Sequence, residues 1–460
     1  MVSSAPTASP GSSRPSQLES LPKVSLLPGI LRQPPFYLLA DIAREHGGFV
    51  RLTIGPKSVY LVSDPLIFQH VLRDNVQNYR KSRFLYSAAK PMVGEGLLTS
   101  EGDYWLRQRR LVQPQFHHTR IAAMAQMMTE IAADRMAAWA REDQPGTRAD
   151  MGERMAQITV EVVSHTLFGT ATLSPTEIDE LGGDMVDAAN YVALRGYMPF
   201  IPRSIPLPGH GRFSRAIHNL TGAVNTIIEA GTKGEVKDDN LITMLLNAVD
   251  DETHEHMTHQ QLFYEVMTLF AAGFETTATA LTWIWKLLGE NPQVEQTLRE
   301  EIARVIGDRV PTFEDLPKLT YCRQVFQECL RYYPPIPLLP RTTLADDEIN
   351  GYKIPKGTIL LMFFYGLHHN ADYWESPDSF DPTRFTPSAV ESRHRFAYLP
   401  FSAGPRQCIG NEFAMTEGML VLAMMLQRYR VTLADDAVTP NLSATLKPNP
   451  GVYATLTPIR

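Results

Sequence analysis

The stretch FSAGPRQCIG, residues 401–410, places one cysteine in a short loop, with an arginine two residues before it. Gly404 and Gly410 could simply be turn residues, and Cys408 could be a buried thiol. A thiolate, however, is favoured by backbone N–H groups at a helix N-terminus, and a helix is expected to follow this loop. Glycines let a backbone approach a flat ligand closely, and Arg406 would then lie at an acidic edge of that ligand. The loop therefore makes Cys408 a candidate metal ligand.

The composition narrows the class of protein. The chain has 460 residues, a formal net charge of −7, 44% hydrophobic residues and 20% charged residues, which is ordinary for a soluble globular protein. This charge balance gives no reason to expect nucleic acid. Three scattered cysteines without a CxxC pair predict reduced thiols, no zinc site and a cytoplasmic location. No run approaches the roughly 18–20 apolar residues of a membrane span, so no membrane anchor is expected.

Hydrophobic periodicity predicts a mainly α fold with a small β region. Residues 1–18, rich in Ser and Pro, are expected to be disordered, and residues 19–460 to form one domain. A β-hairpin is expected at 48–63, a strand region at 352–364, and a last strand pair near 431–434 and 452–457. The helical segments are expected at 36–46, 65–74, 102–114, 119–141, 152–168, 175–193, 212–231, 259–289, 292–306, 317–332 and 411–427.

The longest of these helices, 259–289, would be about 45 Å long and should cross the interior. Its middle contains AGFETT. The glycine lowers the stability of a helix by about 1 kcal/mol relative to alanine, and the acid is costly to bury in an apolar stretch unless it is paired. A helix crossing or a solvated kink could explain this window. Alternatively, Thr276 could bond back to the Ala272 carbonyl, and Gly273 could leave room for a small ligand. Glu275 and Thr276 would then supply a proton carrier and a hydroxyl beside that space.

Two charged pairs are also candidates. Glu328 and Arg331 share a helix face, and Arg384, in the stretch FDPTRF, could bridge the same carboxylate. The alternative is an exposed ion pair of little energetic value. Trp105 and Arg109 lie four residues apart and could present an indole N–H and a guanidinium to an anion. Here the alternative is an amphipathic helix with snorkelling arginines.

Taken together, these residues resemble a known family. FSAGPRQCIG resembles the haem-binding signature of the cytochrome P-450 monooxygenases at every fixed position, namely Phe401, Gly404, Arg406, Cys408 and Gly410. AGFETT is similar to the oxygen-activation motif of that family, and ECLR and FDPTRF are similar to its Glu-x-x-Arg helix and the segment that follows. The motifs also come in the order that the family has.

The resemblance implies haem b as the cofactor, with Cys408 as the thiolate ligand of its iron. It implies that Glu275 and Thr276 are the catalytic acid–alcohol pair, and that the haem lies between the long central helix and the helix after the cysteine loop. A structural triad is implied at Glu328, Arg331 and Arg384. The implied cofactor-binding residues, of which the arginines and Trp105 would hold the propionates, are Trp105, Arg109, Ala272, Gly273, Arg341, Phe401, Gly404, Arg406 and Gly410.

The activity implied is insertion of one oxygen atom from O2 into a C–H bond or C=C bond of an apolar small molecule. Fatty acids, terpenoids, steroids and macrocycles all fit the apolar segments expected around the pocket. A separate ferredoxin or flavodoxin with its NAD(P)H reductase should supply electrons to a monomeric enzyme, through a face that carries Arg107, Arg110 and Arg323. The alternatives are a peroxide-driven or non-oxygenating haem-thiolate enzyme and a haem-binding sensor without turnover.

Overall fold

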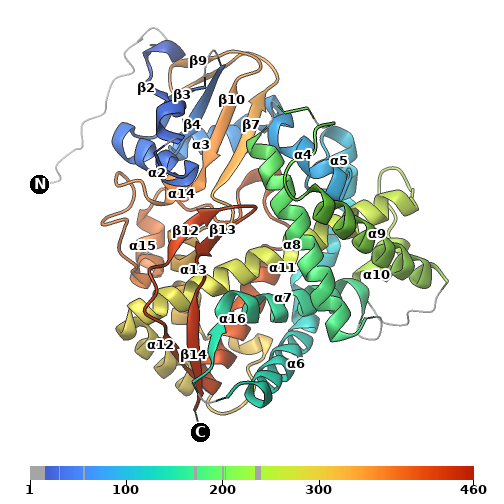
Figure 1. Cartoon of the computed structure of the whole chain (residues 1–460). Helices are drawn as coiled ribbons and strands as arrows, with labels where there is room; N and C mark the ends of the chain where they lie inside the picture. The colour runs from blue at the N-terminus through green and yellow to red at the C-terminus, as the bar shows by residue number, and fades with distance from the viewer. Residues whose placement is uncertain are drawn as a thin grey trace, which may run out of the picture.

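The β-rich part of the molecule is organised around a six-stranded sheet with the order β2-β3-β4-β10-β7-β5 (Figure 1). The computed structural model describes residues 16–30, 32–54, 57–144, 146–169, 173–198, 201–202, 204–233 and 240–459. The strands of this sheet are β2 (Lys23–Ser25), β3 (Phe49–Ile54), β4 (Lys57–Val62), β5 (Tyr79–Lys81), β7 (Leu338–Thr343) and β10 (Ile359–Phe363). The smaller sheets contain β1 (Ser16–Gln17), β6 (Arg148–Asp150), β8 (Asp347–Ile349), β9 (Tyr352–Ile354), β11 (Tyr429–Leu433), β12 (Thr439–Leu442), β13 (Leu446–Asn449) and β14 (Tyr453–Pro458).

The strand predictions are confirmed. β3 and β4 form the expected hairpin, in which Phe49 is opposite Val62, and β11 pairs with β14 near the C-terminus. Val50 and Val62 are fully buried, as the hydrophobic alternation of this segment requires. At the sheet edge, β5 pairs with β7 so that Lys81 is opposite Arg341. The sheet therefore places two basic residues side by side.

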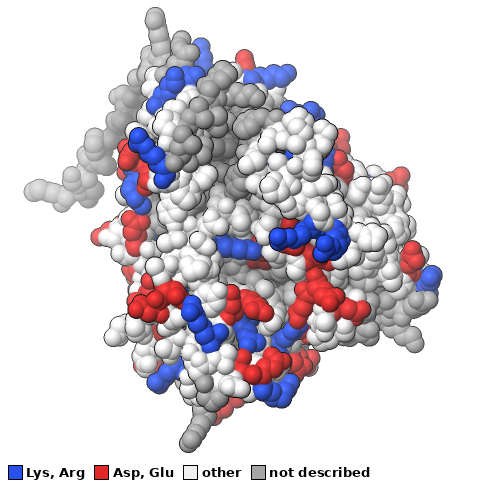
Figure 2. Space-filling model, in the orientation of Figure 1, with Lys and Arg blue, Asp and Glu red and all other residues white. Residues whose placement is uncertain are grey.

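Helices make up most of the chain, as predicted. They are α1 (Leu26–Ile30), α2 (Pro35–His46), α3 (Pro65–Gln69), α4 (Arg83–Val93), α5 (Gly102–Val112), α6 (His118–Glu142), α7 (Met151–Phe168), α8 (Pro175–Tyr197), α9 (His210–Thr232), α10 (Leu241–Asn247), α11 (His259–Glu290), α12 (Pro292–Val305), α13 (Thr320–Tyr332), α14 (Phe364–His368), α15 (Pro387–Ser392) and α16 (Asn411–Arg428). Among the described residues, no helix has the length and apolar character needed to span a bilayer. Figure 2 shows acidic and basic side chains interspersed over one face of the molecule.

The 32-residue helix α11 crosses the middle of the molecule (Figure 1). Thr258 caps its N-terminus in a capping box with Gln261, which satisfies two free N–H groups. Its middle is buried on several sides, with Phe270 and Trp283 fully inaccessible. It packs mainly against α7, and α16 also contacts it. The expectation of a long helix through the interior is confirmed.

Several elements were absent from the sequence-based expectation, among them two helices and a hairpin. Helix α4 contains Pro91, a residue that predicts a helix break, and α10 has only seven residues, too few for a clear periodic pattern. Strands β12 and β13 form a two-stranded hairpin in which Pro440 is opposite Pro448. Proline lowers the strand signal because it donates no ladder hydrogen bond. The segment 65–74, expected as one helix, is α3 followed by a π-helical turn, η2 (His70–Asp74).

The expected boundary between a disordered segment and the domain lies too late in the chain. Residues 1–15 lie outside the described residues. Ser16 and Gln17 pair in parallel with β9, and Leu18 is buried with 7% exposure. The ordered domain therefore includes residues 16–18, because β1 pairs with β9 and the Leu18 side chain is buried in the β-rich part.

Candidate active site

The cysteine loop, residues 401–410, is closed by a 2.9 Å hydrogen bond from the Cys408 N–H to the Phe401 carbonyl. Gly404 has φ +71°, and a Cβ there would lie 1.8 Å from the Leu72 carbonyl oxygen. Its small size is therefore already required by contact with the backbone of η2, and its role beside a flat ligand stays a prediction. At Gly410 φ is −92°, and a Cβ would meet nothing nearer than Phe116, at 3.9 Å, so the protein imposes no comparable constraint there.

Cys408 is the accessible thiol of the chain. Cys322 and Cys329 are buried in α13, and burial raises the pKa of both. The surrounding protein also raises the pKa of Cys408 by desolvation, although its side chain stays accessible, while the Gly410 N–H and the Arg109 guanidinium act in the opposite direction. Among the described residues, no three His, Cys, Asp or Glu side chains gather into a metal site. Cys408 is thus suited to be a single protein ligand to a metal whose other ligands belong to a cofactor.

A cluster of cations lies next to this loop. The Arg406 guanidinium stacks over the Trp105 ring, at 4.3 Å from the ring centroid, and forms an ion pair with Glu101. The Lys81 ammonium donates to the carbonyls of Leu97 and Ser100, at 2.7 and 3.0 Å. We call these residues, together with Arg341, the cationic cradle; its members are Lys81, Glu101, Trp105, Arg341 and Arg406.

The charges in the cationic cradle do not balance. Two carboxylates act on Lys81, those of Glu101 and the buried Glu265, and burial raises the pKa of Glu265 to about 7, which weakens its negative charge. Nη1 of Arg406 is buried without a hydrogen-bond partner among the described residues. Burial, and then the neighbouring Arg406 charge, lower the pKa of Lys81 to about 7. A ligand with two carboxylates would neutralise this excess and satisfy the free guanidinium nitrogen. The residues present therefore fit the two propionates of a haem.

Sequence reasoning placed Trp105, Arg341 and Arg406 in this group but missed Lys81 and Glu101. Lys81 is one basic residue in the stretch YRKSR, and nothing in that stretch sets it apart from its neighbours. Its position becomes evident only from the pairing of β5 with β7.

Arg109 lies elsewhere than expected. Its Nη1 donates to the Gln407 carbonyl at 2.9 Å, and its Nε donates to Gln113 at 2.9 Å. The side chain is therefore held against the cysteine loop rather than within the cationic cradle. From this position it acts on the Cys408 thiol through its charge.

On α11, Ala272 and Thr276 lie one turn apart on an accessible strip of a helix that is otherwise largely buried here. The Thr276 hydroxyl donates to the Ala272 carbonyl at 3.0 Å, as the sequence suggested. Gly273 points away from this strip, because a Cβ would lie 3.0 Å from Val163 of α7. The expectation that Gly273 makes room for a ligand is therefore wrong, since its small size serves the packing of α7 on α11.

Glu275 is buried and faces the C-terminal hairpin. Its Oε1 lies 2.8 Å from the Lys447 ammonium and accepts a 3.2 Å hydrogen bond from Thr445. Among the described residues, no hydrogen bond joins this carboxylate to the Thr276 hydroxyl. The acid and the alcohol are neighbours in sequence, but their side chains leave α11 in different directions.

The structure brings Glu328, Arg331 and Arg384 together. Glu328 and Arg331 are fully buried and form two hydrogen bonds, at 2.7 and 2.8 Å, and Arg384 lies 3.4 Å from the same carboxylate. The Asp381 N–H also donates to Glu328, at 2.9 Å. The exposed-pair alternative for these residues is therefore wrong, because the carboxylate is surrounded by donors in the interior.

Comparisons with known proteins agree with this geometry. The family model described as Cytochrome P450 matches residues 15–455. Cyclooctatin synthase of Streptomyces melanosporofaciens is 36% identical over 441 residues, which cover 94% of this chain and 91% of the relative. Cyclooctat-9-en-7-ol 5-monooxygenase of the same organism is 33% identical, and the match covers 86% of this chain and 85% of the relative.

Among solved structures, the cytochrome P450DA heme domain superposes with a TM-score of 0.85 at 26% sequence identity, covering 96% of this chain and 98% of that one. The chain belongs to the cytochrome P450 family. It is a haem-dependent monooxygenase that acts on an apolar small molecule and uses O2 and electrons from redox partners.

Proposed function

We propose that this monooxygenase holds haem b through Cys408 and the cationic cradle and oxidises an unsaturated terpenoid. The observation that carries the haem assignment is the excess of cations beside the accessible Cys408. When bound, the haem supplies the activation of O2, and its thiolate ligand favours O–O cleavage. No CxxCH motif is present in the sequence for covalent attachment, which supports haem b. The free thiols support a cytoplasmic location.

In this proposal, the residues of the chain bind the haem and move protons. Cys408 is the metal ligand, Arg406, Arg341 and Trp105 hold the propionates, and Arg109 holds the cysteine loop. The Thr276 hydroxyl donates to the Ala272 carbonyl, so its oxygen is free to accept a hydrogen bond from a proton-carrying water. Glu275, the acidic neighbour of Thr276, supplies protons to that water.

The terpenoid assignment rests on the relatives. One relative acts, by its name, on cyclooctat-9-en-7-ol, which denotes an unsaturated hydrocarbon skeleton with a hydroxyl group. An apolar pocket fits such a molecule better than a strongly charged one. Substrate binding beside the haem should change the absorption of the haem. Titration of the purified protein with cyclic terpenoid alcohols, fatty acids, steroids and macrocycles, each at the same concentrations, tests this assignment; tighter binding of a fatty acid would contradict it.

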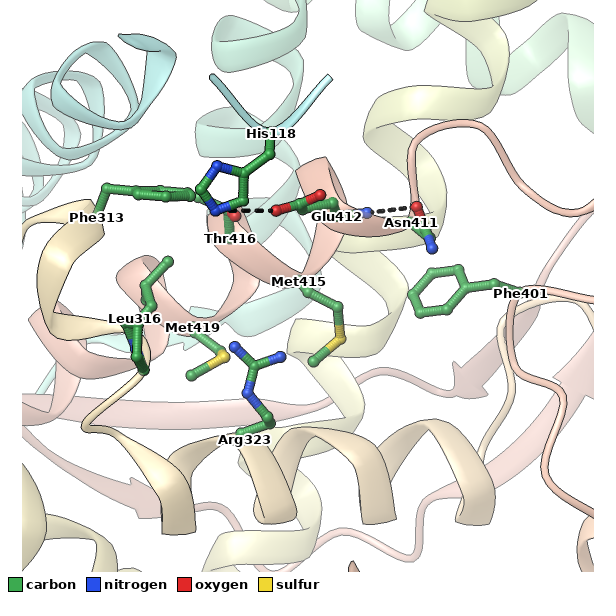
Figure 3. A pocket seen from close by; sticks show the side chains of 11 residues that line it. His118, Phe313, Leu316, Arg323, Phe401, Asn411, Glu412, Met415, Thr416 and Met419 are labelled. Atoms are coloured by element: carbon green, nitrogen blue, oxygen red, sulfur yellow. Dashed lines mark hydrogen bonds and ion pairs between the residues drawn. The ribbon is translucent and has the colours of Figure 1, made fainter. Parts of the chain in front are cut away.

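We also propose that an acidic ferredoxin or flavodoxin delivers the electrons near Arg323. A pocket of about 320 Å³ lies beside the cysteine loop, between α13 and α16 (Figure 3). Arg323 projects into it near Met415 and Met419, and Phe401 of the cysteine loop lines it as well. Arg323 forms no ion pair within the part of the chain that the structure describes. Its charge is therefore available to an acidic partner.

The other two basic residues expected on this face are already paired. Arg110 makes two hydrogen bonds to Asp250, at 2.8 and 3.0 Å, and a 3.0 Å ion pair with Glu252. Arg107 lies 3.4 Å from Glu255. The expectation of a basic patch that includes Arg107 and Arg110 is therefore wrong, because the segment 250–255 neutralises both.

One set of measurements tests the function. With surrogate ferredoxin and reductase, the enzyme should consume NAD(P)H and O2 in proportion to the oxidised product. Product formed with hydrogen peroxide but not with O2 and NAD(P)H would instead establish a peroxide-driven enzyme. Haem binding without product under either condition would favour a sensor.

A further inference from the structure

The Asp347 carboxylate, at the start of β8, joins three side chains that come from around η2 and from β5. Its Oδ2 accepts hydrogen bonds from the Tyr79 hydroxyl at 2.5 Å and from Nδ2 of Asn75 at 2.9 Å, and Nε2 of His70 lies 2.8 Å from the same atom. These partners are 268 to 277 positions away in sequence, so the fold alone assembles the group. We call it the Asp347 node; its members are His70, Asn75, Tyr79 and Asp347.

The Asp347 carboxylate is the charged acceptor of the node. Its side chain is 11% exposed, and burial acts to raise its pKa, but the hydrogen bonds from Tyr79 and His70 outweigh burial and hold the pKa below its ordinary value. Burial, and then the hydrogen bond to Asp347, raise the pKa of Tyr79, so its hydroxyl stays a donor. A charged acceptor makes stronger hydrogen bonds than a neutral one. The ionised carboxylate therefore holds its three partners in fixed positions.

Two of these partners lie at the two ends of η2. His70 begins this π-helical turn and Asn75 follows it, and the Asn75 N–H donates to the His70 carbonyl at 2.8 Å. The Leu72 carbonyl, in the middle of the turn, is the group against which Gly404 of the cysteine loop packs. π-Helical turns are rare and often lie at functional sites. The node therefore holds the turn that supports the loop carrying Cys408.

The third partner, Tyr79, is the first residue of β5, which lies at the edge of the six-stranded sheet. Tyr79 is 2% exposed, and β5 has only three residues, so an anchor at Tyr79 also fixes Lys81 at the other end. The Lys81 N–H donates to one oxygen of Glu101 at 2.5 Å, and the other oxygen of Glu101 pairs with Arg406. The node therefore also holds the strand that contributes to the cationic cradle.

We propose that Asp347 is a positioning residue for the haem site, which sets the cysteine loop through η2 and the cationic cradle through β5. One carboxylate outside the site thus couples the position of the iron ligand to the position of the groups that hold the propionates. This inference rests on the proposed function, because it assumes that Cys408 and the cationic cradle bind haem.

A purely structural fastening is the other explanation, since β8 belongs to the small sheet β1-β9-β8 and the node ties that sheet to η2 and β5. Loss of a fastening lowers the stability of the whole chain, whereas loss of a positioning residue changes the haem site at temperatures where the chain stays folded. Glu301 provides a matched control, because its buried carboxylate also accepts three hydrogen bonds. They come from the Thr320 hydroxyl and from the N–H groups of Tyr321 and Cys322, at 2.8 to 3.1 Å, at the start of α13.

The test compares Asp347→Asn and Glu301→Gln with the parent holoenzyme, well below the melting temperatures. Asp347→Asn should raise the rate of haem transfer to excess apomyoglobin several-fold. It should also move part of the reduced carbon-monoxide complex away from the red-shifted band of a thiolate-ligated haem. Glu301→Gln should lower the melting temperature but leave both readouts as in the parent. If Asp347→Asn keeps the transfer rate and the band of the parent, or if Glu301→Gln changes them equally, the positioning role is overturned.

Two milder variants test the two sides of the node. Asn75→Ala removes a donor beside η2 and should mainly shift the carbon-monoxide band, whereas Tyr79→Phe removes the hydroxyl from β5 and should mainly accelerate haem transfer. Asp347→Asn combined with Tyr79→Phe should release haem no faster than Asp347→Asn alone, because both substitutions remove the same interaction. Additive effects would show that Tyr79 acts independently of Asp347 and would contradict the link through β5.

Hydrogen exchange of the cysteine loop in the holoenzyme gives a local readout. The Cys408 N–H is held by the Phe401 carbonyl at 2.9 Å, so its exchange reports opening of the loop. Segment 401–410 should exchange faster in Asp347→Asn than in the parent and in Glu301→Gln. Equal exchange in all three proteins would exclude the link through η2. Failure of the proposed function is distinguishable, since the parent itself would then bind no haem, or its carbon-monoxide complex would lack the red-shifted band.

Discussion

At the scale of single residues, Cys408 and Thr276 carry the proposed chemistry, and each has a close counterpart elsewhere in the chain. The thiols of Cys322 and Cys329 are buried, whereas Cys408 is exposed. Thr277 follows Thr276, but its side chain is buried, and its hydroxyl lies 3.3 Å from the Gly273 carbonyl. These counterparts provide matched controls for both residues.

Cys408→Ala should abolish the red-shifted absorption band that a thiolate-ligated haem shows in its reduced carbon-monoxide complex. The reason is that the variant removes the axial ligand while leaving the cationic cradle intact, so some haem should still bind. Cys322→Ala and Cys329→Ala should keep the band, because both side chains are fully buried in α13. Persistence of the band in Cys408→Ala would refute the ligand assignment.

Thr276→Ala should keep consuming NAD(P)H while product per NAD(P)H falls several-fold and hydrogen peroxide rises. The variant removes the hydroxyl that accepts a hydrogen bond from a proton-carrying water, but it leaves the haem site unchanged. Thr276→Ser, which keeps the hydroxyl, should form nearly as much product per NAD(P)H as the parent does.

Thr277→Ala serves as the positional control. Glu417 of α16 is fully buried, and desolvation raises its pKa to about 8, while the Thr277 hydroxyl partly opposes this shift. Thr277→Ala should therefore lower the melting temperature and leave the product formed per NAD(P)H nearly unchanged. If product per NAD(P)H fell in Thr277→Ala but not in Thr276→Ala, α11 would be oriented differently from what we propose.

At the scale of elements, the buried pair of Glu328 and Arg331 joins α13 to the segment before the cysteine loop. Arg331 also donates to the carbonyls of His368, Pro377 and Ser379, at 2.8 to 3.0 Å. Burial raises the pKa of Glu328, and Arg331 opposes this shift. The arginine therefore serves both as the counter-charge of the carboxylate and as a hydrogen-bond donor to three backbone carbonyls.

Arg331→Ala should destabilise the holoenzyme by about 3–5 kcal/mol, because it leaves a buried carboxylate without its main partner. Thermal unfolding and the ratio of haem to protein after purification measure this loss. Arg44→Ala is the control, since Arg44 is 62% exposed and lies 3.9 Å from Asp378. Exposed pairs contribute about 0–1 kcal/mol. If the two variants were equally stable, the buried triad would not hold the fold together.

At the scale of the whole molecule, the net charge of −7 opposes the approach of an acidic partner, so docking must depend on local positive charge. The face in Figure 2 mixes both signs, and Arg107 and Arg110 are neutralised within the chain. Arg323, beside the cysteine loop, remains available. Electron delivery should therefore depend on a few charges rather than on a broad basic surface.

Arg323→Glu should lower the rate of electron transfer from a ferredoxin several-fold at low salt and flatten its salt dependence. The cause is loss of an attraction that salt screens over about 10 Å at 0.1 M. Stopped-flow reduction in the presence of carbon monoxide measures this rate. Lys356→Glu, with the same charge change at an exposed position between β9 and β10, should have little effect. A rate in the parent that does not respond to salt would exclude steering by Arg323.

The sequence by itself determined the features that depend on residues close together in the chain. The loop around Cys408, the pairing of Glu328 with Arg331 one turn later, and the back-bond of Thr276 to Ala272 all follow from local spacing, because short stretches have few possible conformations. Hydrophobic periodicity likewise predicted the long helices and the hairpin at 48–63. Short elements were not predicted because their periodic signal is weak, and α4 was not predicted because its Pro91 indicates a helix break.

Only the tertiary structure decided which charges meet. Glu101 and Arg406 lie 305 positions apart, and Thr445 lies 170 positions from Glu275, so no local pattern could pair them. The same holds for Asp250, which neutralises Arg110, and for Lys81, which β5 places opposite Arg341. Whether a charge is free, neutralised or buried depends on what the fold brings within a few ångströms, because electrostatic interactions weaken with distance and with exposure to water.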